Sequence, residues 1–218
     1  MIYKAFLSYS HAADGQLAPA VQKALHGLAK PLFQLRAVRV FRDKSSLSAN
    51  PALWPAIERA LSESEFFLLL ASPQAAASPW VIREIQWWLT NRSVDKILVL
   101  LTEGEIAWDT SANDFDWTKV TALPRIFGGW FPDEPLYVDL RWARSAESLS
   151  VRHSQFRAAI LDIAAPLHGR PKDELDGEDV RGHRRTKRFG VVSCDCHSDR
   201  CLCRRMGGSR SEAAPTGS

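Results

Sequence analysis

A glutamate and three tryptophans lie close together in residues 78–89. Trp80 and Glu84 are four residues apart, so they share one face if the stretch is helical. Trp87 and Trp88 follow about one turn later. A carboxylate flanked by flat rings suits a site for a cationic, ring-containing ligand. The same pattern also fits an amphipathic helix whose tryptophans pack in the core and whose glutamate is solvated, so both interpretations stand at this point.

Strand-like and helix-like segments alternate along the chain around this stretch. Strands are expected at residues 2–9, 37–41, 65–72, 96–101 and 136–140, and helices at residues 15–30, 53–61, 79–89 and 146–165. Asp14 is expected to cap the first helix, and Ser78 and Pro79 to begin the third. The long loop after the fourth strand, around Asp109 and Asp116, lacks the spacing of an EF-hand and is interpreted as a surface excursion.

This alternation predicts an α/β fold, with a parallel sheet covered by helices on both faces. The segment 65–72 supports the prediction, because it is apolar throughout its middle, as a central parallel strand is. Ligands bind such sheets at the carboxyl ends of the strands. The loops after Tyr9, Phe41 and Ser72 lie on that edge, and Glu84 is expected at the same rim.

Three motifs of this chain resemble those of the TIR domain family, and of its bacterial members above all. They are residues 3–11, which read Tyr-Lys-Ala-Phe-Leu-Ser-Tyr-Ser-His; residues 40–61, which begin Val-Phe-Arg-Asp-Lys-Ser-Ser-Leu; and Ser78-Pro79-Trp80 followed by Glu84. Their order and spacing agree with the family over most of residues 1–165. The resemblance implies a flavodoxin-like three-layer sandwich with a five-stranded parallel sheet. In contrast to many animal members, no Pro-Gly turn follows Arg42 and Asp43 here.

The resemblance implies one of two activities. Some TIR domains cleave NAD⁺ and release nicotinamide, giving ADP-ribose or a cyclic product, whereas others only bind further TIR domains and relay a signal. The catalytic members carry a glutamate at the position of Glu84, which favours the enzyme. The residues expected to contact the substrate are Ser8, Tyr9, Ser10, Arg42, Asp43, Lys44, Leu47 and Trp80. Each of these eight also has an ordinary interpretation as a strand-end, turn, packing or solvated residue.

One carboxylate is enough for this chemistry. The pyridinium of NAD⁺ leaves as neutral nicotinamide, so no general acid is needed, and positive charge builds on the ribose in the transition state. Glu84 is expected to stabilise that charge, with NAD⁺ as the substrate and without a cofactor or metal. The chain has no GxGxxG or GxxxxGK[ST] loop, which disfavours a dehydrogenase or a P-loop NTPase.

Composition sets the expected partners and location. Residues 1–180 carry a net charge of −3 and residues 181–218 one of +6, so the chain is expected to divide into a TIR domain, 1–168, and a basic, disordered tail, 169–218. The tail holds all four cysteines, as two CxC pairs; zinc is a minor alternative there. A body without cysteine fits the cytoplasm, and no apolar run predicts a membrane span. Nucleic acid is not an expected partner. The resemblance implies a defence effector that assembles with other TIR domains after an unknown activator.

Overall fold

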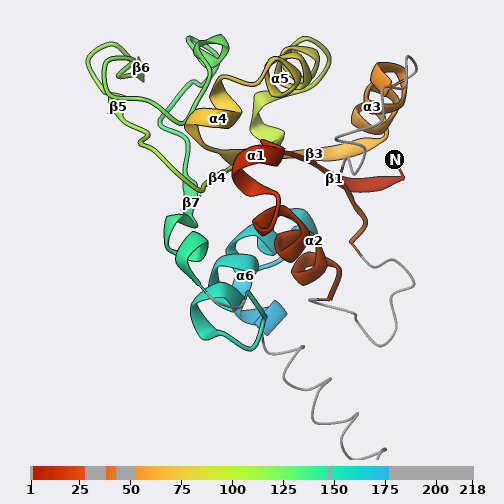
Figure 1. Cartoon of the computed structure of the whole chain (residues 1–218). Coiled ribbons are helices and arrows are strands. Elements are labelled where there is room, and N and C mark those ends of the chain that lie inside the picture. Colours follow the sequence, from red (N-terminus) through yellow and green to blue (C-terminus); the bar gives the residue numbers. More distant parts are fainter. Residues whose placement is uncertain (1, 28–37, 43–52, 147–148, 177–218) are drawn as a thin grey trace, which may run out of the picture.

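A five-stranded sheet lies at the centre of the computed structural model, which describes residues 2–27, 38–42, 53–146 and 149–176 (Figure 1). Its strands are β1 (Tyr3–Ser8), β2 (Val40–Arg42), β3 (Ser64–Ala71), β4 (Ile97–Leu101) and β7 (Tyr137–Asp139). They lie in the order β2-β1-β3-β4-β7, and every neighbouring pair is parallel. The predicted fold class is therefore confirmed.

Helices cover both faces of this sheet (Figure 1). On one face lie α2 (Leu17–Gly27) and α6 (Ser154–His168), and on the other α3 (Leu53–Ser62) and α5 (Pro79–Asn91). The shorter elements are α1 (His11–Asp14), α4 (Pro73–Ala76), the 3₁₀ turns η1 (Val94–Lys96), η2 (Arg125–Phe127) and η3 (Arg141–Ser145), and the strands β5 (Trp108–Asp109) and β6 (Asp114–Phe115). None of the described helices is both long and apolar enough to cross a membrane.

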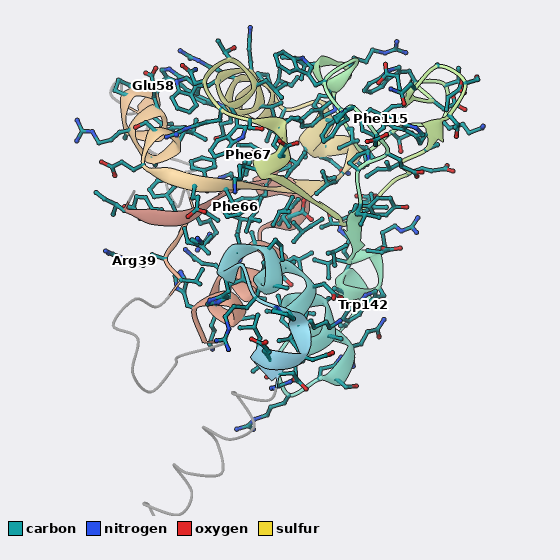
Figure 2. The ribbon with its side chains drawn as sticks, turned by 180° about the vertical axis from the view of Figure 1, so that it is seen from behind. Arg39, Glu58, Phe66, Phe67, Phe115 and Trp142 are labelled. Carbon is teal, nitrogen blue, oxygen red and sulfur yellow. The ribbon has the colours of Figure 1, made fainter. Side chains whose placement is uncertain are left out.

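Strand β3 shows why its sequence is apolar without alternation. Phe66 packs in the core on the α2 and α6 side, whereas Phe67 packs in the core on the α3 and α5 side (Figure 2). Successive side chains of a strand point to opposite faces, and here both faces are covered. The ring of Phe67 lies 5.4 Å from that of Trp88, which is fully buried. Trp88 therefore anchors α5 to the middle of the sheet.

Three expectations about local structure are wrong. The last helix begins at Ser154, not near Ala146, because the side chain of His153 caps it by accepting from the N–H of Phe156, and η3 precedes it. Asp14 does not cap α2; it ends α1, and its side chain is buried. The loop after β4 is not only a surface excursion, since β5 and β6 pair and Phe115 is buried among aromatic rings.

The C-terminal part of the described chain stays on the core. Gly169 ends α6 in the left-handed conformation, with φ of 63°, which suits glycine at this position. Leu175, six positions later, is fully buried in the core on the α2 and α6 side. The predicted boundary at residue 168 is untested, and the cysteines and most of the predicted tail lie outside the described residues.

A histidine attaches β2 to the helix beside it. The backbone N–H of Val40 donates to Nε2 of His26, at 2.9 Å, and Gln22 donates to the carbonyl of Val40, also at 2.9 Å. Nε2 can accept this hydrogen bond only while it carries no proton. Burial lowers the pKa of His26, and the nearby Arg39 acts in the same direction. The neutral imidazole is therefore the form that stabilises the contact between α2 and β2.

We expect this contact to make folding sensitive to acid. Because the pKa of His26 is lower in the folded state, the unfolded chain takes up the proton first as the pH falls below 6.5, and stability is lost in that range. Urea unfolding at pH 7.5 and pH 5 should show that the free energy of unfolding falls less between these pH values in His26→Gln than in the wild type. At pH 7.5 the variant should be less stable by about 1 kcal/mol. Equal losses in both proteins would contradict this role.

Candidate active site

Ser8 and Glu84 meet at the carboxyl end of the sheet. Ser8 is the last residue of β1, and Glu84 lies in the second turn of α5. The hydroxyl of Ser8 donates to Oε2 of Glu84, at 2.5 Å. Ser8 is 1% and Glu84 6% exposed. The predicted catalytic glutamate is thus a nearly buried carboxylate held by a strand-end serine.

Two helix caps place Glu84 at this rim. Ser72, directly after β3, accepts a hydrogen bond from the N–H of Ala75 and begins α4. Ser78 accepts from the N–H of Val81 and begins α5, with Pro79 at the first helical position, as predicted. Hydroxyl caps satisfy N–H groups that the start of a helix leaves free, so Ser72 begins a helix directly after the strand and Ser78 begins the next one two residues after α4 ends. The chain can therefore turn from β3 into α5 with Glu84 facing the sheet edge.

The tryptophans of α5 divide between the core and the rim. Trp88 is fully buried, whereas Trp80 is 46% exposed. The ring of Trp80 lies 6.5 Å from that of Trp54 on α3, and the guanidinium of Arg83 lies 3.8 Å from the Trp54 ring. Trp88 therefore fits the packing interpretation, although Glu84 is buried and not solvated, and a ligand-binding role of Trp80 stays a prediction. Trp80, one turn before Glu84, leaves an accessible aromatic surface beside the carboxylate.

Tyr9 and Arg42 form a second contact at the same edge. The Arg42 guanidinium donates through Nη1 to the hydroxyl of Tyr9, and through Nε to Oε1 of Gln22, both at 3.0 Å. Tyr9 is buried, and its ring lies 4.5 Å from that of His11. Arg42 therefore joins the ends of β1 and β2, and two of its donors are engaged within the protein.

The remaining predicted site residues contribute differently. Ser10 is buried and begins α1 through its carbonyl, which accepts from the N–H of Asp14 at 2.8 Å; its hydroxyl makes no capping bond. Asp43, Lys44 and Leu47 lie outside the described residues. The structure thus brings Ser8, Tyr9, Ser10, Arg42, Trp80 and Glu84 to one edge.

A second carboxylate near this edge has a role that the sequence did not indicate. Asp14 is 1% exposed and contacts Ser72, Thr102 and Arg144. Burial raises the pKa of Asp14, and its hydrogen bonds and the charge of Arg144 oppose that shift only in part. Its partners are distant in the sequence and follow three different strands, so no local pattern links them.

The described residues contain no group of three or more His, Cys, Asp and Glu side chains that could hold a metal ion. The candidate site consists of the carboxylate of Glu84, the hydroxyl of Ser8 that donates to it and the accessible ring of Trp80, one helical turn away. Such an arrangement can stabilise positive charge that develops on a bound substrate.

Comparison with known proteins identifies the family of this chain. The family model described as TIR domain matches residues 6–125, and the chain belongs to this family. A curated relative, the NAD(+) hydrolase ApTIR of Actinoplanes sp., is 53% identical over 198 residues; the match covers 90% of this chain and 28% of the relative. The chain therefore spans little more than a quarter of that relative's length.

Among solved structures, the TIR domains of the activated Roq1 resistosome, directly recognizing the pathogen effector XopQ, are similar with a TM-score of 0.37. They are 14% identical, and the match covers 83% of this chain and 98% of that chain.

A double-mutant cycle measures how strongly Ser8 and Glu84 are coupled. Ser8→Ala removes a donor from a buried carboxylate and should destabilise the fold, whereas the same change in a Glu84→Gln background should cost less. We expect a coupling energy of about 1–3 kcal/mol from urea unfolding of the four proteins at pH 7. A coupling near zero would show that the hydroxyl does not hold the carboxylate. Ser145→Ala, on an exposed hydroxyl of η3, is the matched control.

Proposed function

We propose that this protein is an NAD⁺ hydrolase that releases nicotinamide, with Glu84 as its catalytic residue. The observation that carries the proposal is the carboxylate of Glu84, held by Ser8 at the carboxyl end of β1, one helical turn from the exposed ring of Trp80. The 53% identical relative is named an NAD(+) hydrolase, which supports the same substrate for this chain.

The reaction breaks the bond between C1′ of the ribose and the pyridinium nitrogen. The bonding electron pair stays with that nitrogen, which loses its positive charge as nicotinamide departs. The ribose becomes cationic, and the carboxylate of Glu84 stabilises it more strongly as the charge grows. Water then bonds to C1′ and releases a proton, giving ADP-ribose. Attack by a nitrogen of the substrate's own adenine in place of water gives a cyclic product instead.

The neighbouring residues act by position. The hydroxyl of Ser8 donates to Oε2 of Glu84, which keeps that carboxylate aimed at the rim. The accessible ring of Trp80 offers a surface on which the flat nicotinamide can stack. Arg42 stands at the end of β2, where its remaining donors can meet a phosphate, and Asp43, Lys44 and Leu47 follow it in the chain.

We further propose that the enzyme works in the cytoplasm as a defence effector that depletes NAD⁺ once its TIR domains assemble. The defence role follows from the family resemblance. Assembly is supported by the surface beside β7, which is an edge strand of the sheet. Between β7, β4 and α6 lies a groove of about 690 Å³, lined mainly by apolar side chains that include Leu98, Val138 and Ile163. Leu136, at its margin, is 95% exposed, and such exposed apolar surface favours contact with another protein.

Turnover of NAD⁺ tests the catalytic role. Purified wild-type protein should release nicotinamide, and mass spectrometry of the product should give either linear or cyclic ADP-ribose. Glu84→Gln keeps the size of the side chain but removes its charge, so we expect a rate at least about a hundredfold lower. Glu134→Gln, on an exposed carboxylate, should leave the rate unchanged. Full activity in Glu84→Gln would contradict the mechanism. No release by the folded, assembled wild type would favour a noncatalytic TIR scaffold instead.

A concentration series tests activation by assembly. The rate per molecule should rise with protein concentration in the wild type. Leu136→Asp places a charge on the groove margin, so we expect a flatter series from a protein of unchanged stability. Ile2→Asp changes another exposed apolar residue, 53% accessible, at the start of the chain, and serves as the control. A rate per molecule that is constant across the series would contradict activation by assembly.

A further inference from the structure

A polar cluster with a buried centre links four of the strand-end segments at the carboxyl edge. We define the Asp14 cluster as Asp14, Ser72, Thr102, Glu103 and Arg144. These residues belong to α1, the cap of α4, the segment after β4 and η3. α1 follows β1, whose last residue is Ser8, and α4 leads into α5, the helix that carries Glu84. The cluster thus joins the two segments that form the candidate site.

The contacts of Asp14 converge from different elements. The hydroxyl of Ser72 donates to Oδ2 of Asp14 at 3.4 Å, and the side chain of Thr102 lies close enough to this carboxyl group to influence its pKa. Arg144 approaches Oδ1 at 3.7 Å and donates to the carbonyl of Ala13 at 2.7 Å. The same guanidinium is paired with Glu103. Asp14 is therefore the member that contacts three of the other four.

Ser72 transmits this contact to α4 and α5. Its hydroxyl also accepts from the N–H of Ala75 at 3.2 Å, so one side chain both caps α4 and holds Asp14. The chain then turns without a break, since Ala77 donates to the carbonyl of Pro73 and Ser78 to that of Ala75. Ser78 begins α5, in whose second turn Glu84 lies. A displacement at Ser72 is thus carried along a short, hydrogen-bonded path to the site.

Thr102 fixes the cluster to the sheet. Its N–H and its hydroxyl both donate to the carbonyl of Ala71, at 2.8 and 3.1 Å. Ala71 is the last residue of β3, directly before Ser72. Ser72 and Thr102 therefore hold Asp14 at the end of the central strand. Since Asp14 is the last residue of α1, that helix is held there as well.

We infer that Asp14 is a positioning residue. It holds α1 against the start of α4 and so keeps Ser8 and Glu84 close enough to form their hydrogen bond. Because Asp14 is 1% exposed, it acts through its neighbours and does not touch the substrate. Burial raises its pKa, which agrees with a role that rests on hydrogen bonds and shape more than on charge. The kinetic part of this inference rests on the proposed NAD⁺ hydrolysis, whereas the structural part stands independently.

Two substitutions separate the hydrogen bonds from the charge. Asp14→Asn keeps the shape and an acceptor oxygen, and Asp14→Ala removes both. Hydrogen–deuterium exchange of the full chain should become at least about tenfold faster in residues 9–16 and 72–84 of Asp14→Ala, while residues 154–168 stay unchanged. Asp14→Asn should exchange as the wild type does. The control is Asp162→Asn, which removes a half-exposed carboxylate of α6 that is paired with Lys172.

The kinetic arm uses the same proteins with NAD⁺. In Asp14→Ala, kcat should fall between about tenfold and a hundredfold with KM changed less than about threefold, and Asp14→Asn should restore kcat to within about threefold of the wild type. If Asp14→Ala does not fold, Thr102→Val removes one hydroxyl partner and should give the same pattern in weaker form.

The two arms fail in different ways. Unchanged exchange in both segments of Asp14→Ala or Thr102→Val would overturn the positioning role, and so would an Asp14→Asn protein as impaired as Asp14→Ala. A wild type that never releases nicotinamide would refute the proposed function alone, because the exchange experiment still decides what Asp14 does.

Discussion

A carboxylate taken out of water must find hydrogen-bond donors, and the hydrogen bond from Ser8 to Glu84 meets that need at 6% exposure. The two residues lie 76 positions apart, so the bond exists only when β1 and the start of α5 come to the same edge. A parallel sheet brings them there, because all its strands end at one side. The rest of the structure serves this geometry. The caps at Ser72 and Ser78 turn the chain, and Trp88 anchors α5 against the sheet.

Two regions of the sheet differ in chemistry. Near β1 and β3, polar side chains are buried and hydrogen-bonded, as at Ser8, Asp14 and Ser72. Low polarity around such groups strengthens their hydrogen bonds and makes an unpaired group costly, which favours a single arrangement. At the amino end of β7, Leu136 is almost fully exposed beside the mainly apolar groove between β7, β4 and α6. One region thus favours a fixed geometry, whereas the other leaves apolar surface exposed.

A single helix combines packing with a candidate ligand surface. Trp88 fills the core beside Phe67, while Trp80 remains at the rim beside Glu84. Eight positions separate these tryptophans, a little more than two helical turns, yet they differ completely in exposure. The difference arises because the middle of α5 lies over the sheet and its first turns extend to the edge. Whether an aromatic residue of α5 is buried therefore depends on its distance from that edge and on the face of the helix that it occupies, since Trp87, next to Trp88, is only partly buried.

The sequence by itself determined the strand and helix order, the parallel sheet and the roles of Ser78 and Pro79, because hydrophobic periodicity and caps are local properties. It also predicted Glu84, Trp80 and the strand-end residues as a candidate site, since such sheets bind ligands at the carboxyl ends of their strands. Only the tertiary structure decided what each of them contacts. The pairing of Glu84 with Ser8, the engagement of Arg42 by Tyr9, and the burial of Asp14 depend on segments far apart in the chain. Local patterns carry no information about such contacts, because the contacts form only when the strands pair side by side in the sheet.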